Sequence, residues 1–262
     1  MQSREDIISL VEGSGQLIAA AIHNGHDVRP EIAEFFAISE EKRMREEDPY
    51  TALFTEISDT RIVAKTSRFE VDLNRPRNNA VYRGPENAWG IDVWKEFPPN
   101  AVIERSLEKY DKFYTAARAV ILSKIQKFGR VLVFDLHSYN HRRNGPDSPP
   151  ADPKSNPEVN VGTGTLDRGK WAPVADKFIR ELRSHNFMDR NLDVRENVKF
   201  KGGYFSKWIH ETFPESACAL ALEFKKFFMD EWTGKPDREV IESIKNALRA
   251  VVPNVLEVFN NC

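Results

Sequence analysis

The chain has 262 residues, of which 40% are hydrophobic and 30% charged, and its formal net charge is −2. This length and composition are typical of one soluble domain with a single sizeable core. The nearly balanced charge excludes a global field that would recruit nucleic acid or an acidic membrane, so we expect neither as a partner.

The sequence also indicates the compartment. No apolar run reaches the roughly 18 residues of a membrane span, and the polar residues 1–6 are not followed by the hydrophobic segment of a signal peptide. Cys218 lies in an apolar run and Cys262 is the last residue, which argues against a disulfide framework and against a cysteine-rich zinc site. We therefore expect a cytoplasmic protein, in which any metal is bound by histidine and carboxylate side chains.

The predicted elements follow from apolar runs and helical spacing. Strands are expected at residues 16–22, 61–65, 69–73, 130–136, 193–200 and 217–224. Helices are expected at residues 40–48 after Ser39 as N-cap, around residues 107–121 with Gly129 closing the helix, at residues 170–184, from about Tyr204, and from Asp237 to an interruption at Pro253.

Strands that alternate with helices predict the fold class, which is α/β. We expect one domain over residues 1–262, with a mixed, mainly parallel sheet covered by helices on both faces. Residues 138–168 are rich in Pro, Asn, Asp and Gly and show little periodicity, which predicts a long loop at the active site.

Three side chains with useful chemistry each close an apolar run, namely His23, His137 and Glu223. In open α/β sheets, ligands bind at the carboxyl ends of the strands, so these residues are expected to meet there. Imidazole is a common zinc ligand, and His26, three residues after His23, is either a further ligand or a partner of one. Asp135 precedes His137 by two residues on the same strand face and could orient its ring.

Residues 67–76 (SRFEVDLNRP) contain two arginines around Asp72. A guanidinium binds a carboxylate through two parallel hydrogen bonds, which predicts a substrate anchor, and Arg68 could instead stabilise an oxyanion. The alternative is a structural cluster of salt bridges. Glu223 follows an apolar strand, where a raised pKa suits a general base, unless Lys225 and Lys226 neutralise it.

Two further segments are candidates for binding an anion. Gly202 and Gly203 allow close approach of the backbone to a ligand just before a helix, although a plain turn explains them equally. Arg142, within residues 141–143 (HRR), could bind an anionic group from the long loop, or could simply be solvated. His185 and His210 are expected to be structural.

In this order the motifs resemble those of the N-formylglutamate amidohydrolases, a family similar in fold to the zinc carboxypeptidases and to aspartoacylase. The resemblance covers most of the chain, from about His23 to Met229. The segments that carry it are residues 23–25 (HNG), 67–76 (SRFEVDLNRP), 135–138 (DLHS), 160–163 (NVGT), 200–203 (FKGG) and 222–223 (LE).

The resemblance implies a zinc ion with His23 and His137 as ligands. The third ligand would be His26, from the His-x-x-Glu pattern of the carboxypeptidases, or Asp48, and His26 is favoured. It further implies that Asn74 and Arg75 hold the substrate's α-carboxylate, that Arg68 polarises the scissile carbonyl, and that Glu223 is the general base.

The expected function is zinc-dependent hydrolysis of the amide bond of a small N-formyl or N-acyl amino acid. Zinc would lower the pKa of a water molecule whose proton Glu223 takes. One alternative is a carboxypeptidase or peptidoglycan-type amidase on the same scaffold, and another is a non-catalytic ligand-binding protein. A metal-free hydrolase based on Ser138 lacks the Gly-x-Ser-x-Gly motif. The sequence predicts neither the acyl group nor the amino acid, and it predicts no oligomeric state.

Overall fold

The computed structural model describes residues 7–262. A seven-stranded sheet in the order β1-β3-β2-β4-β7-β5-β6 forms its centre. The strands are β1 (Ile8–Val11), β2 (Leu17–Ala21), β3 (Thr60–Ala64), β4 (Val131–Tyr139), β5 (Val159–Gly162), β6 (Val194–Glu196) and β7 (Ala217–Lys225). The pairs β3–β2, β2–β4, β4–β7 and β5–β6 are parallel, whereas β1–β3 and β5–β7 are antiparallel. The predicted single α/β domain with a mixed, mainly parallel sheet is confirmed.

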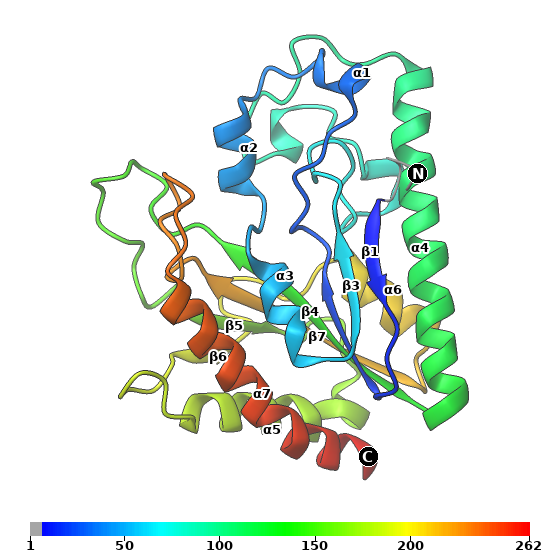
Figure 1. Cartoon of the computed structure of the whole chain (residues 1–262), viewed down its shortest axis with the longest axis vertical. Helices are drawn as coiled ribbons and strands as arrows, with labels where there is room; N and C mark the ends of the chain where they lie inside the picture. Colours follow the sequence, from blue (N-terminus) through cyan, green and yellow to red (C-terminus); the bar gives the residue numbers. More distant parts are fainter. Residues whose placement is uncertain (1–6) are drawn as a thin grey trace.

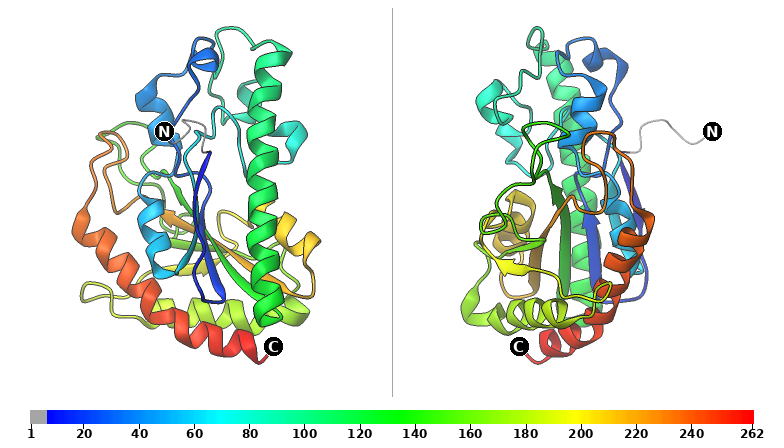
Figure 2. Two further views of the ribbon diagram at one scale, coloured as in Figure 1. Left: turned by 45° about the vertical axis from the view of Figure 1, so that its right-hand side comes forward. Right: turned by 90° about the vertical axis from the view of Figure 1, so that its left-hand side faces the viewer.

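Helices cover both faces of the sheet (Figures 1 and 2). They are α1 (Pro30–Ala33), α2 (Glu40–Glu46), α3 (Thr51–Phe54), α4 (Asn100–Phe128), α5 (Arg168–Ser184), α6 (Tyr204–Thr212) and α7 (Arg238–Asn260), with short 3-10 helices η1 (Thr55–Ile57), η2 (Arg77–Asn79) and η3 (Pro85–Asn87). Apolar side chains of α4 and α6 pack on one face of the sheet, and those of α5 and α7 on the other. No helix within residues 7–262 is long and apolar enough to cross a membrane.

The central strand β4 explains why its sequence is apolar almost without a break. All nine of its residues are buried, because both faces of the strand are covered. Leu132, Phe134 and Leu136 belong to the core beneath α5 and α7, whereas Val131 and Val133 belong to the core beneath α4 and α6. Polar residues on this strand therefore have to find partners inside the molecule.

Two predicted elements are wrong for identifiable reasons. Residues 69–73 form turns rather than a strand, because the backbone N–H of Glu70 bonds back to Ser67 and that of Asp72 bonds across to Ala80. Helix α7 continues through Pro253 to Asn260, since burial of Val255 and Phe259 in the core outweighs the hydrogen bond that proline cannot make.

Other boundaries shift. The strand expected at residues 193–200 is reduced to β6, and the edge strand β1 was not expected. The long loop predicted at residues 138–168 is shorter, because β4 extends to Tyr139 and β5 lies within the range. Its irregular part covers residues 140–158.

Candidate metal centre and catalytic site

The candidate site lies at the carboxyl ends of β2, β4 and β7. His23 follows β2 by two residues, and its backbone carbonyl accepts a hydrogen bond of 3.0 Å from the N–H of Asp48. His137 of β4 is the register partner of Glu223 of β7. The sheet thus brings together the three residues that the sequence placed at strand ends, and the turn after α2 adds a carboxylate to them.

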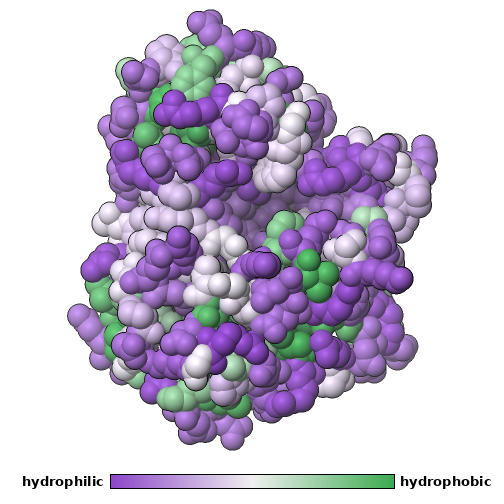
Figure 3. Space-filling view, turned by 180° about the vertical axis from the view of Figure 1, so that it is seen from behind, coloured by the Kyte–Doolittle hydropathy of each residue, from purple (hydrophilic) through white to green (hydrophobic). Residues whose placement is uncertain are grey.

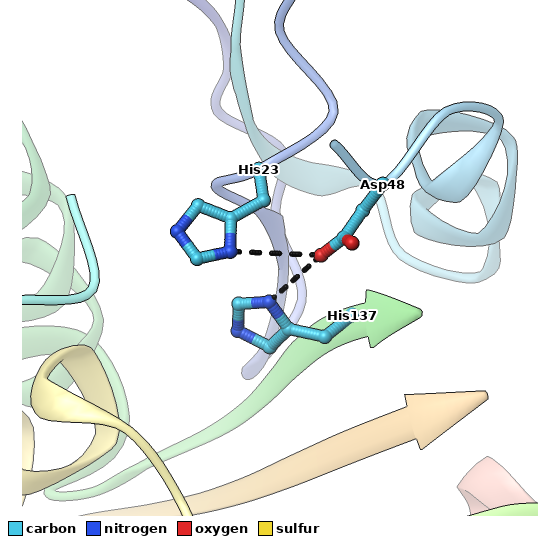
Figure 4. Close-up of side chains that lie close together, drawn as sticks. All are labelled: His23, Asp48 and His137. Carbon is cyan, nitrogen blue, oxygen red and sulfur yellow. Dashed lines mark hydrogen bonds and ion pairs between the residues drawn. The ribbon is translucent and has the colours of Figure 1, made fainter. Parts of the chain in front are cut away.

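His23, Asp48 and His137 form a buried group whose ligand atoms all lie within 4.8 Å of one another. Figure 4 shows both imidazole rings facing the carboxylate of Asp48. The Nδ1 atoms of His23 and His137 lie 3.6 and 3.1 Å from the same oxygen, Oδ2 of Asp48. One oxygen and two ring nitrogens therefore converge on one small volume.

Two further carboxylates fix the rings from behind. Nε2 of His23 lies 2.7 Å from Oδ1 of Asp72, and Nε2 of His137 lies 2.9 Å from Oδ1 of Asp135. An ionised carboxylate only accepts hydrogen bonds, so each ring donates from Nε2 and directs the lone pair of Nδ1 toward Asp48. Two lone pairs and an anionic oxygen repel one another unless a cation or a proton lies between them. The donor set of two imidazoles and one carboxylate fits a divalent transition metal such as zinc.

His26, the favoured third ligand in the sequence analysis, lies outside this group. Its Nδ1 hydrogen-bonds to Glu47 and its Nε2 lies 3.4 Å from Glu40. The hydrogen bond to Glu47 raises the pKa of His26 although partial burial opposes this. The backbone of Asp27 pairs with residues 65 and 67, which directs His26 away from His23. The geometry therefore favours the alternative, Asp48.

Arg68 approaches the group from the turn after β3. Its Nε donates to the hydroxyl of Tyr82 at 3.1 Å and its Nη2 to Oδ2 of Asp72 at 2.9 Å. Burial would raise the pKa of Asp72, yet the charge of Arg68 holds it well below its usual value. Within residues 7–262 no hydrogen bond uses Nη1 of Arg68, and this side chain lines the cavity. Asp72 thus orients both a ring and a guanidinium.

Glu223 has the environment expected of a general base. Burial raises the pKa of its carboxyl to about 7. Lys225 and Lys226 do not neutralise this carboxylate, because both donate elsewhere. Nζ of Lys225 donates to the carbonyl of Asn156. Nζ of Lys226 donates to the carbonyls of Arg45 and Glu47. The interpretation of Glu223 as part of a plain salt bridge therefore has no support in the geometry.

These side chains open into one cavity of about 320 Å³. The molecule is hollowed between its upper and lower parts in the space-filling view, and the surface there is largely hydrophilic (Figure 3). The cavity is lined by His23, Glu46, Asp48, Arg68, Asn74, Trp89, His137, Ser138, Tyr139, Asn140, Arg143, Lys199, Phe200, Lys201, Gly202, Gly203, Glu223 and Lys226.

Asn74, Gly202 and Gly203 are part of this lining, as the sequence analysis expected of binding residues. A side chain at position 203 would collide with the carboxamide of Asn74, since an added Cβ would lie 2.1 Å from its Nδ2. Asn74 is fixed there because its Oδ1 accepts the N–H of Phe205 at 2.9 Å. The glycine is therefore needed so that Asn74 can reach the cavity.

Two expected binding residues do not line the cavity. Nη2 of Arg75 donates to the backbone carbonyl of Asn87 at 2.7 Å, so Arg75 ties down a neighbouring turn. Arg142 lines a separate hollow, and its Nη1 lies 3.3 Å from the carbonyl of Pro146. Its neighbour Arg143 lines the cavity instead.

Several residues of the cavity were not predicted from the sequence. Lys199 and Trp89 belong to no motif, because they come from loops of irregular pattern, and Lys201 lies within the motif at residues 200–203 but was given no role. The charged triplet at residues 141–143 was a partial signal, but a loop gives no rule for which of its side chains points inward. Arg143, Lys199 and Lys201 add three cationic side chains to the cavity lining, where they attract anionic ligands.

The sequence profile of the N-formylglutamate amidohydrolase family matches residues 15–229. The chain belongs to this family. It is a hydrolytic enzyme, and the resemblance predicted from its motifs is confirmed. No curated protein matches the chain in sequence.

Two crystal structures have a similar fold. The N-formylglutamate amidohydrolase of Ralstonia eutropha JMP134 is 17% identical, with a TM-score of 0.76 over 96% of this chain and 97% of that one. A gene product of Agrobacterium tumefaciens is 15% identical, with a TM-score of 0.71 over 99% of this chain and 98% of that one. At such low identity these likenesses show the fold alone.

Proposed function

We propose that this family member hydrolyses the amide bond of a small N-formyl or N-acyl amino acid with the help of a bound zinc ion. The observation that carries the proposal is the meeting of His23, Asp48, His137 and Glu223 in one cavity. A non-catalytic binding protein would not need a carboxyl group of raised pKa beside these three side chains, and neither would a purely structural site.

His23, Asp48 and His137 would hold the ion, and Asp72 and Asp135 would fix the two rings. When bound, zinc supplies a Lewis acid that lowers the pKa of water and polarises a carbonyl group. Three protein ligands leave room for water or substrate, which is the usual arrangement of catalytic zinc.

Glu223 carries the protons in this proposal. It takes one from the attacking water and delivers it to the nitrogen of the departing amine. With a pKa of about 7, its carboxyl group can both accept and release a proton near neutral pH. Its register pairing with His137 sets it beside the side chains that would hold the ion, which supports this role.

Arg68 polarises the scissile carbonyl in this proposal. Its Nη1 is available to donate to the carbonyl oxygen, while Asp72 and Tyr82 hold the rest of the guanidinium. Charge that develops on the oxygen would be stabilised by a donor that is already in place, which requires no rearrangement during the reaction.

Asn74, Gly202 and Gly203 would bind the carboxylate of the amino acid, aided by the cations of Arg143 and Lys199. Arg75 supports this region through the neighbouring turn rather than by contact. Binding the carboxylate holds the amide in the orientation that attack requires. Asn140 and Arg143, from the loop at residues 140–158, line the cavity.

The size of the cavity favours this function over a peptidase. About 320 Å³ lies at the small end of ligand sites and suits a single acyl amino acid better than a peptide or glycan strand.

The test combines metal analysis of the purified protein with a screen of N-formyl and N-acetyl amino acids, with and without a chelator. We expect about one zinc per chain and chelator-sensitive hydrolysis of at least one such substrate. A zinc-loaded protein that cleaves none of them, but cleaves peptides, would contradict the proposal.

A further inference from the structure

Trp89 combines an unusual backbone with an unusual position. Of the described residues that line the cavity, Trp89 alone among the non-glycine residues has a positive φ, at 54°. A bulky side chain rarely adopts this conformation. The residue is 48% exposed, so burial in the core does not account for the strain. Such outliers persist where the surrounding structure holds them, and they cluster at binding sites.

The turn that carries Trp89 is held on both sides. Gly90 and Ala88 both donate their backbone N–H groups to the carbonyl of Pro85, at 2.8 and 2.9 Å. Ala88 and Ile91 are buried in a small hydrophobic cluster. Arg75 adds its hydrogen bond to the carbonyl of Asn87. These anchors fix the backbone on both sides of Trp89, so the indole extends from a fixed point at the edge of the cavity.

The indole packs against the arginine of the site. The guanidinium carbon of Arg68 lies 4.7 Å from the centre of the Trp89 ring, a favourable cation–π distance. Tyr82, which hydrogen-bonds to Arg68, also contacts the indole edge to face, with ring centres 6.1 Å apart. The ring is therefore fixed next to the group that, in the proposed function, contacts the scissile carbonyl oxygen.

We propose that Trp89 is the specificity-determining wall of the acyl subsite and restricts the acyl group to formyl. The inference rests on the proposed function, in which Arg68 contacts the carbonyl oxygen. In the binding mode that we propose, the acyl substituent, which is bonded to the same carbon as that oxygen, lies on the side of the indole and the amine lies on the other. A formyl group has only a hydrogen there, whereas an acetyl group adds a methyl group that would collide with the ring packed on Arg68 and Tyr82.

The test compares kcat/KM for the N-formyl and N-acetyl derivatives of one amino acid in the wild type and in Trp89→Ala. We expect the wild type to prefer the formyl substrate and the variant to lose about tenfold or more of that preference, mainly by gaining activity on the acetyl substrate. The matched control is Trp232→Ala, because Trp232 also stacks on an arginine, Arg45 at 3.7 Å, but does not line this cavity. This control should keep the wild-type preference.

Trp89→Gly distinguishes the effect of removing the indole from the effect of the strained backbone at this position. Glycine adopts a positive φ freely, so this variant should melt at a higher temperature than Trp89→Ala while showing the same loss of preference. An unchanged formyl-to-acetyl ratio in both folded variants would overturn the proposal, as would a wild type that prefers acetyl, while leaving the proposed function intact. A wild type that hydrolyses neither substrate, nor any other N-acyl amino acid, would instead remove the proposed function on which this inference rests.

Discussion

His137 of β4 and Glu223 of β7 are direct register partners in neighbouring parallel strands. Partners in register point to the same side of a sheet, so the strand pair itself sets a ring nitrogen and a carboxylate side by side. Strands β4 and β7 share nine consecutive register pairs, from Val131 with Ala217 to Tyr139 with Lys225. The relative position of the proposed base and the proposed ligand is thus fixed by the rigid centre of the fold and not by a loop.

We predict that Glu223→Gln retains its metal and loses turnover. The amide has nearly the shape of the carboxylate but cannot accept the proton, and proton transfer by a positioned side chain typically contributes about 10²–10⁴-fold. Metal content and kcat, measured on the same sample, check this. Glu196→Gln, on β6 but outside the cavity lining, is the control and should keep wild-type kcat. Normal turnover in Glu223→Gln would refute the role given to this residue.

The two candidates for the third ligand predict opposite outcomes. Asp48→Asn should weaken zinc affinity by more than about 100-fold, because it removes an anionic oxygen that both rings face. This loss exceeds the effect usual for residues that only hydrogen-bond to a metal ligand. His26→Gln should leave the affinity within a few-fold, since His26 contacts Glu47 and Glu40 rather than the group. Competition with a chromophoric chelator measures both affinities. The reverse result would restore His26 as the ligand.

Much of this site could be predicted because the end of a strand can be recognised from a short stretch of sequence. His23, His137 and Glu223 each close an apolar run, and a parallel sheet collects such ends at one edge. What the sequence could not give is the path of the chain between strands. The choice of Asp48 over His26 depends on how Asp27 pairs with residues 65 and 67 and turns His26 outward, which is a contact across about 40 residues.

The same limit explains the errors in the fold. Residues 69–73 have an alternating pattern that suits a strand, yet Arg29 and Lys109 bind Glu70 and hold the segment in turns. No local rule predicts partners that lie some 40 residues away on either side. Arg75 was assigned to the substrate because of its chemistry, and in the structure that chemistry holds the turn before Trp89 instead.

The carboxylate behind His137 should matter for metal binding. Asp135→Asn should weaken zinc affinity by about 10–100-fold, because the amide no longer offers an anionic acceptor to Nε2 and the ring loses its fixed tautomer. Ser206 donates to the other oxygen of Asp135 at 2.9 Å, which fixes the orientation of the carboxylate in the wild type. Chelator competition again gives the affinity, and circular dichroism checks the fold. An affinity equal to that of the wild type would show that this hydrogen bond does not orient the ligand.

Lys226 should act as a support for the Asp48 turn. Its buried Nζ donates to the carbonyls of Arg45 and Glu47 at 2.6 and 2.7 Å. Burial lowers the pKa of Lys226 to about 8, which offsets part of what these bonds contribute. Lys226→Met should therefore cost about 1–3 kcal/mol in the free energy of unfolding and should also lower zinc affinity.

The matched control for this prediction is Lys225→Met. Lys225 is adjacent and half-buried, but its Nζ contacts the carbonyl of Asn156, far along the chain from Asp48. Urea unfolding with and without zinc measures both effects. If both variants lose the same stability and neither loses zinc affinity, Lys226 has no part in positioning Asp48.

The acid limb of the stability curve should depend on His210. Its Nε2 accepts the backbone N–H of Ala219 at 3.0 Å and its Nδ1 pairs with the hydroxyl of Thr165 at 3.0 Å, so the ring has to be neutral. Burial lowers the pKa of His210 to about 4, against about 6.5 in the unfolded chain. Between these values the unfolded state binds a proton that the folded state does not, so stability falls as the pH drops from about 6.5 to 4.

His210→Gln tests this, because the glutamine can accept the same N–H and does not titrate. Between pH 7 and pH 5 the wild type should lose about 2 kcal/mol more unfolding free energy than the variant. Urea titrations of both proteins at the two pH values, with chelator present throughout, give this difference and cancel the contribution of every other titrating group. If both proteins lost the same unfolding free energy, His210 would take up its proton as readily in the folded state as in the unfolded chain. Its Nε2 would then not be held as an acceptor by β7.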